Sequence, residues 1–135
     1  MCCPIISALC SSCCLSYIHS EGIAAGELKH GPIALIDESL NVVAITPNDN
    51  LFSKTISSIK EIEARGGKII MISDQDGLNQ ATDIYQDSIE MPDVIDFLSP
   101  ILYSIPVQLL AYYVAVFKGT DVDQPRNLAK SVTVE

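Results

Sequence analysis

Positive charge is scarce in this sequence. Eight Lys and Arg stand against seventeen Asp and Glu, which leaves a formal net charge of −9. A chain this acidic lacks the basic surface that nucleic-acid binding requires, and it lacks the polybasic cluster that attracts anionic membranes. We therefore expect no nucleic acid and no membrane among its partners.

Several motifs of nucleotide-binding and catalytic sites are missing as well. There is no G-x-x-x-x-G-K-[ST] and no G-x-G-x-x-G, which argues against phosphate cradles of the Walker and Rossmann types. The absence of G-x-S-x-G argues against the nucleophile elbow of α/β-hydrolases. The two histidines, His19 and His30, do not form a helical pair, so we expect neither a metal nor a cofactor.

Charged residues are absent from the first twenty positions, and the first fourteen hold all five cysteines. A signal peptide would need a positively charged start, yet Lys29 is the first basic residue. Cys10 and Cys13 have the spacing of a zinc or redox pair, but structural zinc needs four ligands. The cysteines lie too close together to form a disulfide framework. We favour residues 1–14 as a leader unrelated to the fold, with free thiols in a reducing compartment, and the other interpretations stay open.

The remaining chain alternates between apolar strands and helices. Residues 41–46 and 68–73 are apolar, β-branched runs typical of buried strands, and residues 88–91 form a weaker third run. Apolar residues recur at helical spacing over 52–62, and a short helix is expected over 79–85. This alternation predicts an α/β fold with a parallel sheet.

Local signals mark the ends of the first of these helices. The Asn-Asp-Asn run at 48–50 offers side chains that cap a helix start, and Gly66-Gly67 is a typical stop. Glu61 and Arg65 have the i,i+4 spacing of a helical ion pair. Residues 74–77 have the composition of a turn.

The longest uncharged run extends from Phe97 to Phe117, which is long enough to cross a membrane. Ser99 and Pro100 suit a helix start, and Gly119 suits its end. A helix packed between a sheet and a second domain would also be apolar all round. We favour that buried helix, because Pro106 interrupts the run, and a small membrane protein stays open as the alternative.

Two polar segments are candidates for chemistry. Residues 26–32 combine both charge signs with the imidazole of His30, which titrates near neutrality and can move protons. Residues 126–131 contain Lys130, whose amine becomes nucleophilic if the tail folds over a pocket. A surface turn and a fraying tail are the simpler interpretations of these two segments.

The last seventeen residues, GTDVDQPRNLAKSVTVE from Gly119 to Glu135, resemble the C-terminal tail of glutamine–fructose-6-phosphate aminotransferases (isomerizing), also called glucosamine-6-phosphate synthases. Residues 17–19, 24–32, 63–67 and 108–112 fit the same family in the same order. The resemblance covers about Leu15 to Glu135. It implies a three-layer αβα fold, in which residues 15–118 form part of the second sugar-isomerase (SIS) domain with a parallel sheet that lacks its first strand. Residues 119–135 would form a lid.

The resemblance also implies a function. The family takes ammonia from glutamine and converts fructose 6-phosphate to glucosamine 6-phosphate, a precursor of UDP-N-acetylglucosamine, as a cytoplasmic homodimer. Lys130 matches the lysine that forms a Schiff base with the sugar carbonyl. His30 matches the histidine that assists ring opening across the dimer interface. The implied substrate-binding residues are Ala129 and Lys130, and the implied lid and channel residues are Arg126, Asn127, Leu128, Ser131, Val132 and Thr133.

The chain departs from the family at the proton shuttle. Where the family has a glutamate and two nearby lysines, this chain has Ser11, Cys13 and Cys14. Neither a thiol nor a hydroxyl replaces a positioned carboxylate base. We therefore expect a fragment that is inactive and marginally stable alone, with unpaired strand edges. A non-catalytic module that binds a sugar phosphate, or docks on an intact synthase, is the alternative.

Overall fold

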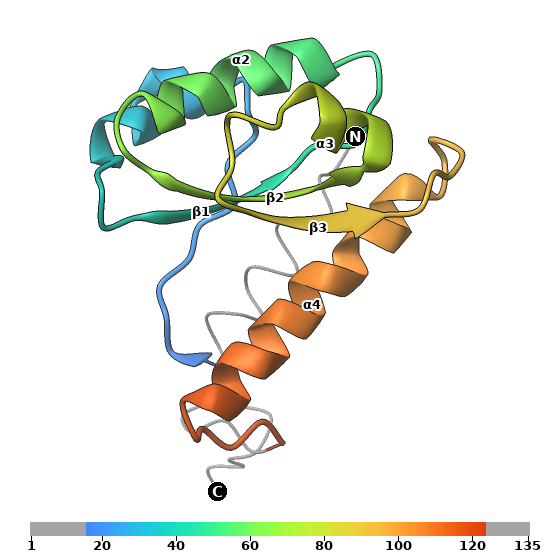
Figure 1. The fold of residues 1–135 in the computed structure, drawn as a ribbon. Coiled ribbons are helices and arrows are strands. Elements are labelled where there is room, and N and C mark those ends of the chain that lie inside the picture. Colours follow the sequence, from blue (N-terminus) through green and yellow to red (C-terminus); the bar gives the residue numbers. More distant parts are fainter. Residues whose placement is uncertain (1–15, 124–135) are drawn as a thin grey trace, which may run out of the picture. The chain divides into compact units, whose positions relative to one another are not determined.

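The computed structural model describes residues 16–123, and these fall into two compact units. Residues 23–99 form the larger unit, which contains every strand of the described chain. Residues 16–22 and 100–123 belong to the smaller unit. Figure 1 labels the helices and strands. The Cys-rich leader and the tail from residue 124 lie outside the described residues.

Three parallel strands form one sheet in the order β1 (Asn41–Ile45), β2 (Lys68–Asp74) and β3 (Asp87–Met91). The predicted strands, the parallel sheet and the α/β class are therefore confirmed. Since β2 lies between two neighbours, its apolar side chains are the most deeply buried. Those with no exposed surface are Ile69, Met71 and Ile72.

Two helices cover one face of this sheet, α2 (Phe52–Glu63) and α3 (Gln75–Gln80) (Figure 1). Residues spaced three and four apart share one side of a helix, and α2 uses that spacing to bury an apolar stripe. The stripe consists of Phe52, Ile56, Ile59 and Ile62. The helix ends where the sequence predicts, because Gly66 takes a positive φ of 81° and its N–H donates to the Glu63 carbonyl at 2.8 Å.

Three local predictions are wrong. The helix expected over 79–85 and the turn expected at 74–77 are replaced by α3, because the Asp74 carboxylate accepts the Gly77 N–H at 2.8 Å and caps a helix that starts at Gln75. Arg65 does not pair with the carboxylate of Glu61. Its Nη1 donates to the Glu61 backbone carbonyl at 2.8 Å instead.

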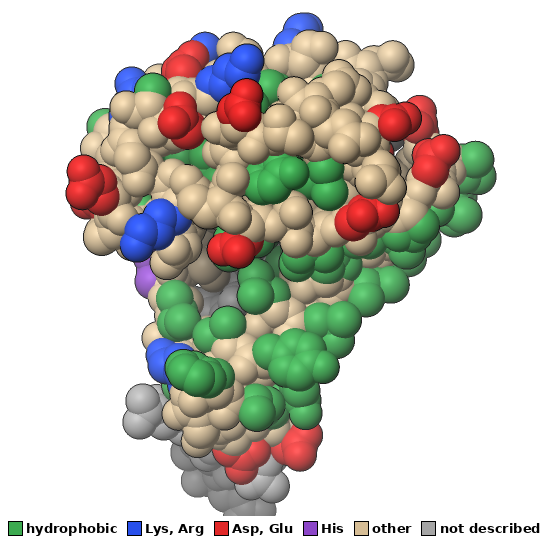
Figure 2. Space-filling view, viewed as in Figure 1, with side chains coloured by type: hydrophobic (Ala, Val, Ile, Leu, Met, Phe, Trp, Pro, Cys, Tyr) green, Lys and Arg blue, Asp and Glu red, His purple; other side chains and the backbone are tan. Residues whose placement is uncertain are grey.

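The smaller unit is dominated by α4 (Ser99–Phe117). It begins at Ser99 as expected and ends at Phe117, and Gly119 just beyond it has a φ of 68°. One side of the helix is buried through Tyr103, Val107, Ala111 and Ala115. The other side is exposed, so the expected burial all round does not occur within the residues that the structure describes, and hydrophobic side chains gather along this surface in Figure 2. By length and composition alone, α4 also meets the criteria for a membrane-crossing helix.

Candidate functional site

The candidate histidine lies at the end of a short 3₁₀ helix, η1 (Leu28–His30), which precedes the sheet in the chain. Leu28 is buried in the core cluster with the apolar residues of α2, whereas Lys29 and His30 are exposed. The His30 N–H donates to the Glu27 carbonyl at 3.1 Å, which closes the turn. One buried leucine therefore fixes the turn and leaves the imidazole in solvent.

Gly31 sets the direction in which the chain leaves His30. Its backbone has φ 149° and ψ −52°, a conformation that residues with a Cβ rarely adopt. A second 3₁₀ helix, η2 (Pro32–Leu35), follows at once, and the Ala34 N–H donates to the Gly31 carbonyl at 2.9 Å. Gly31 thus connects the two 3₁₀ helices.

An ion pair links this turn to α2. The Nζ of Lys29 lies 2.6 Å from Oε1 of Glu61, and the two side chains are 52% and 36% exposed. Exposed pairs of this kind stabilise proteins by about 1 kcal/mol or less. Its contribution is therefore to restrain the turn that carries His30 more than to stabilise the fold.

Polar groups also meet at the carboxyl ends of β1 and β2, where ligands often bind in open parallel sheets. Here the groups bind one another. Ser73 Oγ donates to the Thr46 carbonyl, and the Asp74 carboxylate accepts the N–H of Asn48 at 2.9 Å as well as that of Gly77. These hydrogen bonds join the segment after β1 to the end of β2, and the end of β2 to the first turn of α3.

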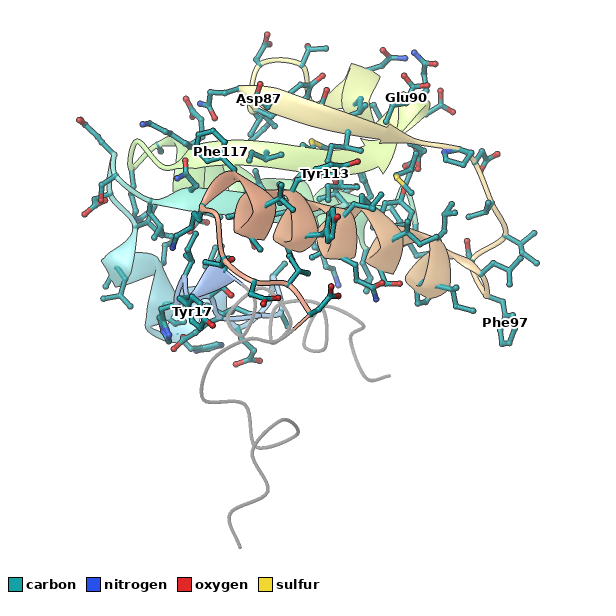
Figure 3. All side chains as sticks on the ribbon, turned by 90° about the horizontal axis from the view of Figure 1, so that it is seen from below. Tyr17, Asp87, Glu90, Phe97, Tyr113 and Phe117 are labelled. Atoms are coloured by element: carbon teal, nitrogen blue, oxygen red, sulfur yellow. The ribbon has the colours of Figure 1, made fainter. Side chains whose placement is uncertain are left out.

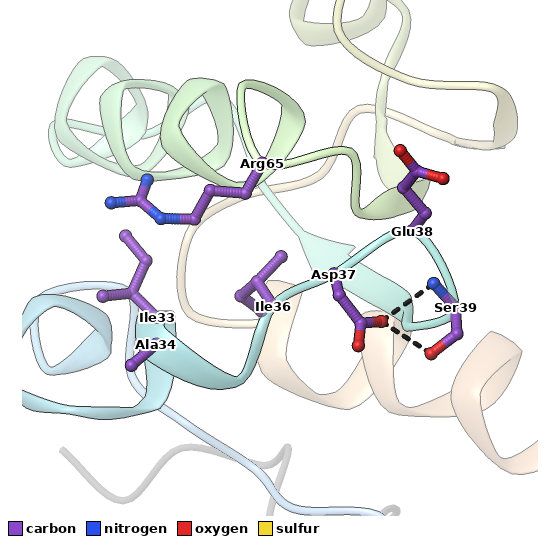
Figure 4. Close-up of a pocket in the computed structure, with 7 residues that line it drawn as sticks. All are labelled: Ile33, Ala34, Ile36, Asp37, Glu38, Ser39 and Arg65. Carbon is purple, nitrogen blue, oxygen red and sulfur yellow. Dashed lines mark hydrogen bonds between the residues drawn. The ribbon is translucent and has the colours of Figure 1, made fainter.

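A hollow of about 680 Å³ lies beside the end of η2 (Figure 4). The Asp37 carboxylate on its wall accepts hydrogen bonds from the Ser39 hydroxyl at 2.6 Å and from the Ser39 N–H at 2.8 Å. These bonds lower the pKa of Asp37, the hydroxyl having the larger effect. The residues lining the hollow are Ile33, Ala34, Ile36, Asp37, Glu38, Ser39 and Arg65.

Of the residues predicted for the site, the structure describes only His30. Among residues 16–123, no ion pair engages its side chain, and no cluster of three potential metal ligands occurs. The other predicted residues lie outside the described residues and remain predictions. They are Lys130, Ala129, Arg126, Asn127, Leu128, Ser131, Val132 and Thr133.

Sequence reasoning missed two links that shape this region. Lys29 and Glu61 are far apart in the chain, and so are Asn48 and Asp74. Neither pair has a local spacing signal, because each depends on how a loop meets a distant helix or strand. The contact between Asn48 and Asp74 could have been predicted only if the register of β1 against β2 were known.

Comparison with known proteins gives consistent results. The sequence profile of the SIS domain matches residues 14–118. A protein of Mesorhizobium japonicum named glutamine–fructose-6-phosphate aminotransferase (isomerizing) is 61% identical over 121 residues, which is 90% of this chain and 20% of that protein. A protein of the same name from Sphingobium yanoikuyae is 60% identical over 121 residues, or 90% of this chain and 78% of its own length.

Two solved structures resemble the chain. The C-terminal domain of glucosamine-fructose-6-phosphate aminotransferase from Francisella tularensis aligns with a TM-score of 0.82 and 43% identity, over 88% of this chain and 33% of that one. Glucosamine-6-phosphate deaminase from Thermotoga maritima aligns with a TM-score of 0.69 at 23% identity, over 96% of this chain and 36% of that one, which supports the fold alone. The chain spans about one fifth of the length of most of the curated relatives that it matches.

Proposed function

Because this chain belongs to the family of glutamine–fructose-6-phosphate aminotransferases, we propose that it supplies part of a site that converts fructose 6-phosphate to glucosamine 6-phosphate. The observation that carries the proposal is the identity of 60% to a relative of which the chain covers 78%. The relatives process sugar phosphates, as their names state, and a sugar phosphate is therefore the proposed ligand.

In the proposed chemistry, Lys130 is the nucleophile. Its amine attacks the carbonyl carbon of open-chain fructose 6-phosphate, and loss of water leaves a Schiff base. His30 moves the proton that ring opening requires, since an imidazole has one nitrogen that can accept a proton and one that can donate it. Ala129 would contact the sugar, and the lid and channel residues, Arg126, Asn127, Leu128, Ser131, Val132 and Thr133, would enclose it.

The position of His30 supports this role. The imidazole is exposed at the tip of a turn that the buried Leu28 holds in place. A histidine displayed outward suits a sugar that is bound mainly by another subunit. We therefore propose a homodimer for the intact enzyme, and we propose a cytoplasmic location, which agrees with free thiols in a reducing compartment.

The chain alone lacks groups that the reaction needs. Ser11, Cys13 and Cys14 occupy the positions at which the family resemblance implies a glutamate and two lysines. Without a carboxylate base the proton cannot pass between the two sugar carbons. The proposed function therefore applies to residues 15–135 joined to a preceding segment that carries these three groups.

A chimera tests the proposal. Residues 16–135 replace the matching segment of an intact relative, which keeps its own residues before that point, and formation of glucosamine 6-phosphate is measured. We expect an active chimera, and we expect Lys130→Arg and His30→Asn each to lower kcat at least about 100-fold. Lys118→Arg and His19→Asn are matched controls that should leave kcat unchanged. A folded chimera in which Lys130→Arg keeps full activity would refute the role of Lys130.

The exposed side of α4 favours a second function, in which the chain docks on an intact synthase without catalysis. Five apolar residues spaced three or four apart form this surface: Ile101, Ile105, Leu109, Tyr112 and Val116. Burial of such a stripe drives association. Co-purification of the chain with an intact relative, lost on Leu109→Lys and kept on Lys54→Met, would support docking.

A further inference from the structure

We propose that Asp76 and Gly77 form a site of spontaneous backbone isomerisation, which the Asp74 carboxylate keeps closed in the folded chain. The site is independent of the proposed function. Asp76 and Gly77 are the only Asp-Gly pair in the sequence, which contains no Asn-Gly pair. Aspartate isomerises most readily before glycine, because glycine has no side chain to hinder attack by its backbone nitrogen.

The reaction needs only water. The Gly77 nitrogen attacks the side-chain carboxyl carbon of Asp76 and forms a new C–N bond, and the carboxyl hydroxyl leaves with the amide proton as water. The product is a five-membered succinimide ring. Water then opens the ring by breaking one of its two C–N bonds. One opening restores aspartate, and the other leaves isoaspartate, whose main chain runs through the former side-chain carbon.

The packing of α3 explains why a glycine follows Asp76. Gly77 is buried, and a Cβ on it would meet the hydroxyl of Ser73 on β2 and lie 3.0 Å from Cε2 of Phe52 on α2. Asp76 itself is exposed to water. The close contact of three elements therefore requires the residue that makes Asp76 reactive.

The folded chain holds the pair in an unreactive conformation. Asp76 is the second residue of α3. With a helical ψ of about −40°, the next nitrogen does not face the side-chain carboxyl carbon, so ring closure requires the backbone to rotate. The Gly77 N–H also donates to the Asp74 carboxylate at 2.8 Å, and the negative charge opposes loss of the amide proton. Both obstacles disappear when the first turn of α3 opens.

Asp74 controls how often this turn opens. A helix as short as α3, Gln75–Gln80, is marginal without capping and tertiary contacts. The second oxygen of the Asp74 carboxylate accepts the Asn48 N–H at 2.9 Å, so the cap is itself fixed to the segment after β1. Opening the turn breaks the bond to Gly77, and local openings of this kind occur without global unfolding.

Incubation of the full chain in heavy-oxygen water at neutral pH tests the proposal. Each passage through the succinimide places one heavy oxygen on residue 76, which fragmentation mass spectrometry localises, and peptide chromatography separates isoaspartate from aspartate. We expect labelling at Asp76 to be at least about tenfold slower in the folded chain than in a peptide of residues 73–80. Asp74→Ala should raise the rate in the folded chain at least about tenfold.

Two controls separate the cap from a general loss of stability. Asp74→Asn keeps an acceptor oxygen and should label within about threefold of the native rate. Ile56→Ala destabilises the core without touching the cap, so its folded form should label as slowly as the native chain.

Asp87 is the internal reference. It is exposed on β3 (Figure 3), and Ser88 is the smallest residue after Gly77 that follows an aspartate in this sequence. Asp74→Ala should leave labelling at Asp87 unchanged, because the cap of α3 does not restrain the backbone of β3.

Urea gives a measurement that needs no variant. Opening one turn exposes little surface, so below the unfolding transition the labelling rate of the native chain should rise less steeply with urea than the unfolded fraction does. Three outcomes would overturn the proposal: a folded native chain that labels as fast as the peptide, a folded Asp74→Ala chain that labels no faster than the native one, or labelling that follows the unfolded fraction in urea.

Discussion

The ammonium group of Lys29 lies 2.6 Å from the carboxylate of Glu61, so the residue next to His30 is linked to the side of α2. Together with the buried Leu28, this pair holds the turn at two points. One contact supplies apolar burial, and the other restrains the orientation of the exposed end. The buried leucine and the ion pair contribute differently to the free energy of unfolding and to the order of the turn, and substitutions can measure both effects.

Glu61→Gln removes the charge from the ion pair. Because both partners are partly exposed, we expect the free energy of unfolding to fall by about 0.5 kcal/mol or less. Amide exchange of η1 should quicken more noticeably, since the turn loses one of its two restraints. Urea unfolding and hydrogen exchange measure the two effects. Glu63→Gln on the same helix is the control, and an equal effect on η1 from both variants would contradict the link.

Gly31→Ala introduces a Cβ where the backbone has φ 149°. The new methyl group has open space around it, so the cost comes from the backbone conformation alone. We expect a loss of about 1–3 kcal/mol in the free energy of unfolding, or a shift of the turn that changes the NMR signals of His30. Gly26→Ala also meets open space but has no positive φ, and it should be close to neutral.

Gly77→Ala places a Cβ against the hydroxyl of Ser73, and 3.0 Å from Cε2 of Phe52. Alanine favours helices over glycine by about 1 kcal/mol, but crowding in a packed interior costs about 1–3 kcal/mol. The crowding should outweigh the helix preference, so thermal unfolding should show a net loss of stability. Ser73→Ala should restore part of this loss in the double variant. If the effects of the two substitutions simply add, the proposed clash is wrong.

Asp74→Ala removes the acceptor for two backbone N–H groups, those of Asn48 and Gly77. The loss of a helix cap typically costs about 1 kcal/mol, and a second hydrogen bond to a charged group adds about 1.5–3 kcal/mol. Urea unfolding should therefore show a loss of about 2.5–4 kcal/mol. Asp83→Ala on an exposed turn should change the stability by less than about 0.5 kcal/mol.

The Asp37 carboxyl should titrate below its usual pKa of about 3.9, because the Ser39 hydroxyl and N–H donate to the charged form. A lowered pKa in the folded chain means that these bonds stabilise it above pH of about 4. The contribution is lost as the pH falls through the lowered pKa. NMR titration of the side-chain carbon measures the pKa. Ser39→Ala should raise the pKa, and Ser57→Ala on α2 should not change it.

Much of the fold could be predicted from local patterns. The strands were found because β-branched runs bounded by turn residues need no long-range information, and α2 was found because its apolar stripe repeats at helical spacing. The predicted position of α3 was wrong, since an Asp such as Asp74 is equally common in turns and at helix starts. Only the hydrogen bond from the Gly77 N–H identifies it as the cap of α3. Local composition could not distinguish a turn from a capped helix at that point.

The candidate site was less accessible to such reasoning. Charge and imidazole content singled out the His30 segment, but its fixed turn depends on Leu28 reaching the core and on Lys29 meeting Glu61. The role of Lys130 rests on the family resemblance and stays a prediction. No periodicity encodes a lid, because a lid takes its shape from the ligand and from the subunits it covers.

The strands follow one another in the sheet in the same order as in the chain. Asn41 pairs with Lys68, 27 residues later in the chain, and Ile70 pairs with Asp87, 17 residues later. Each crossover can therefore close before the ribosome has finished the next element, since domains begin to fold during synthesis. A nascent chain that has emerged as far as Met91 contains all three strands of the described residues, so the central strand β2 already has both of these neighbours.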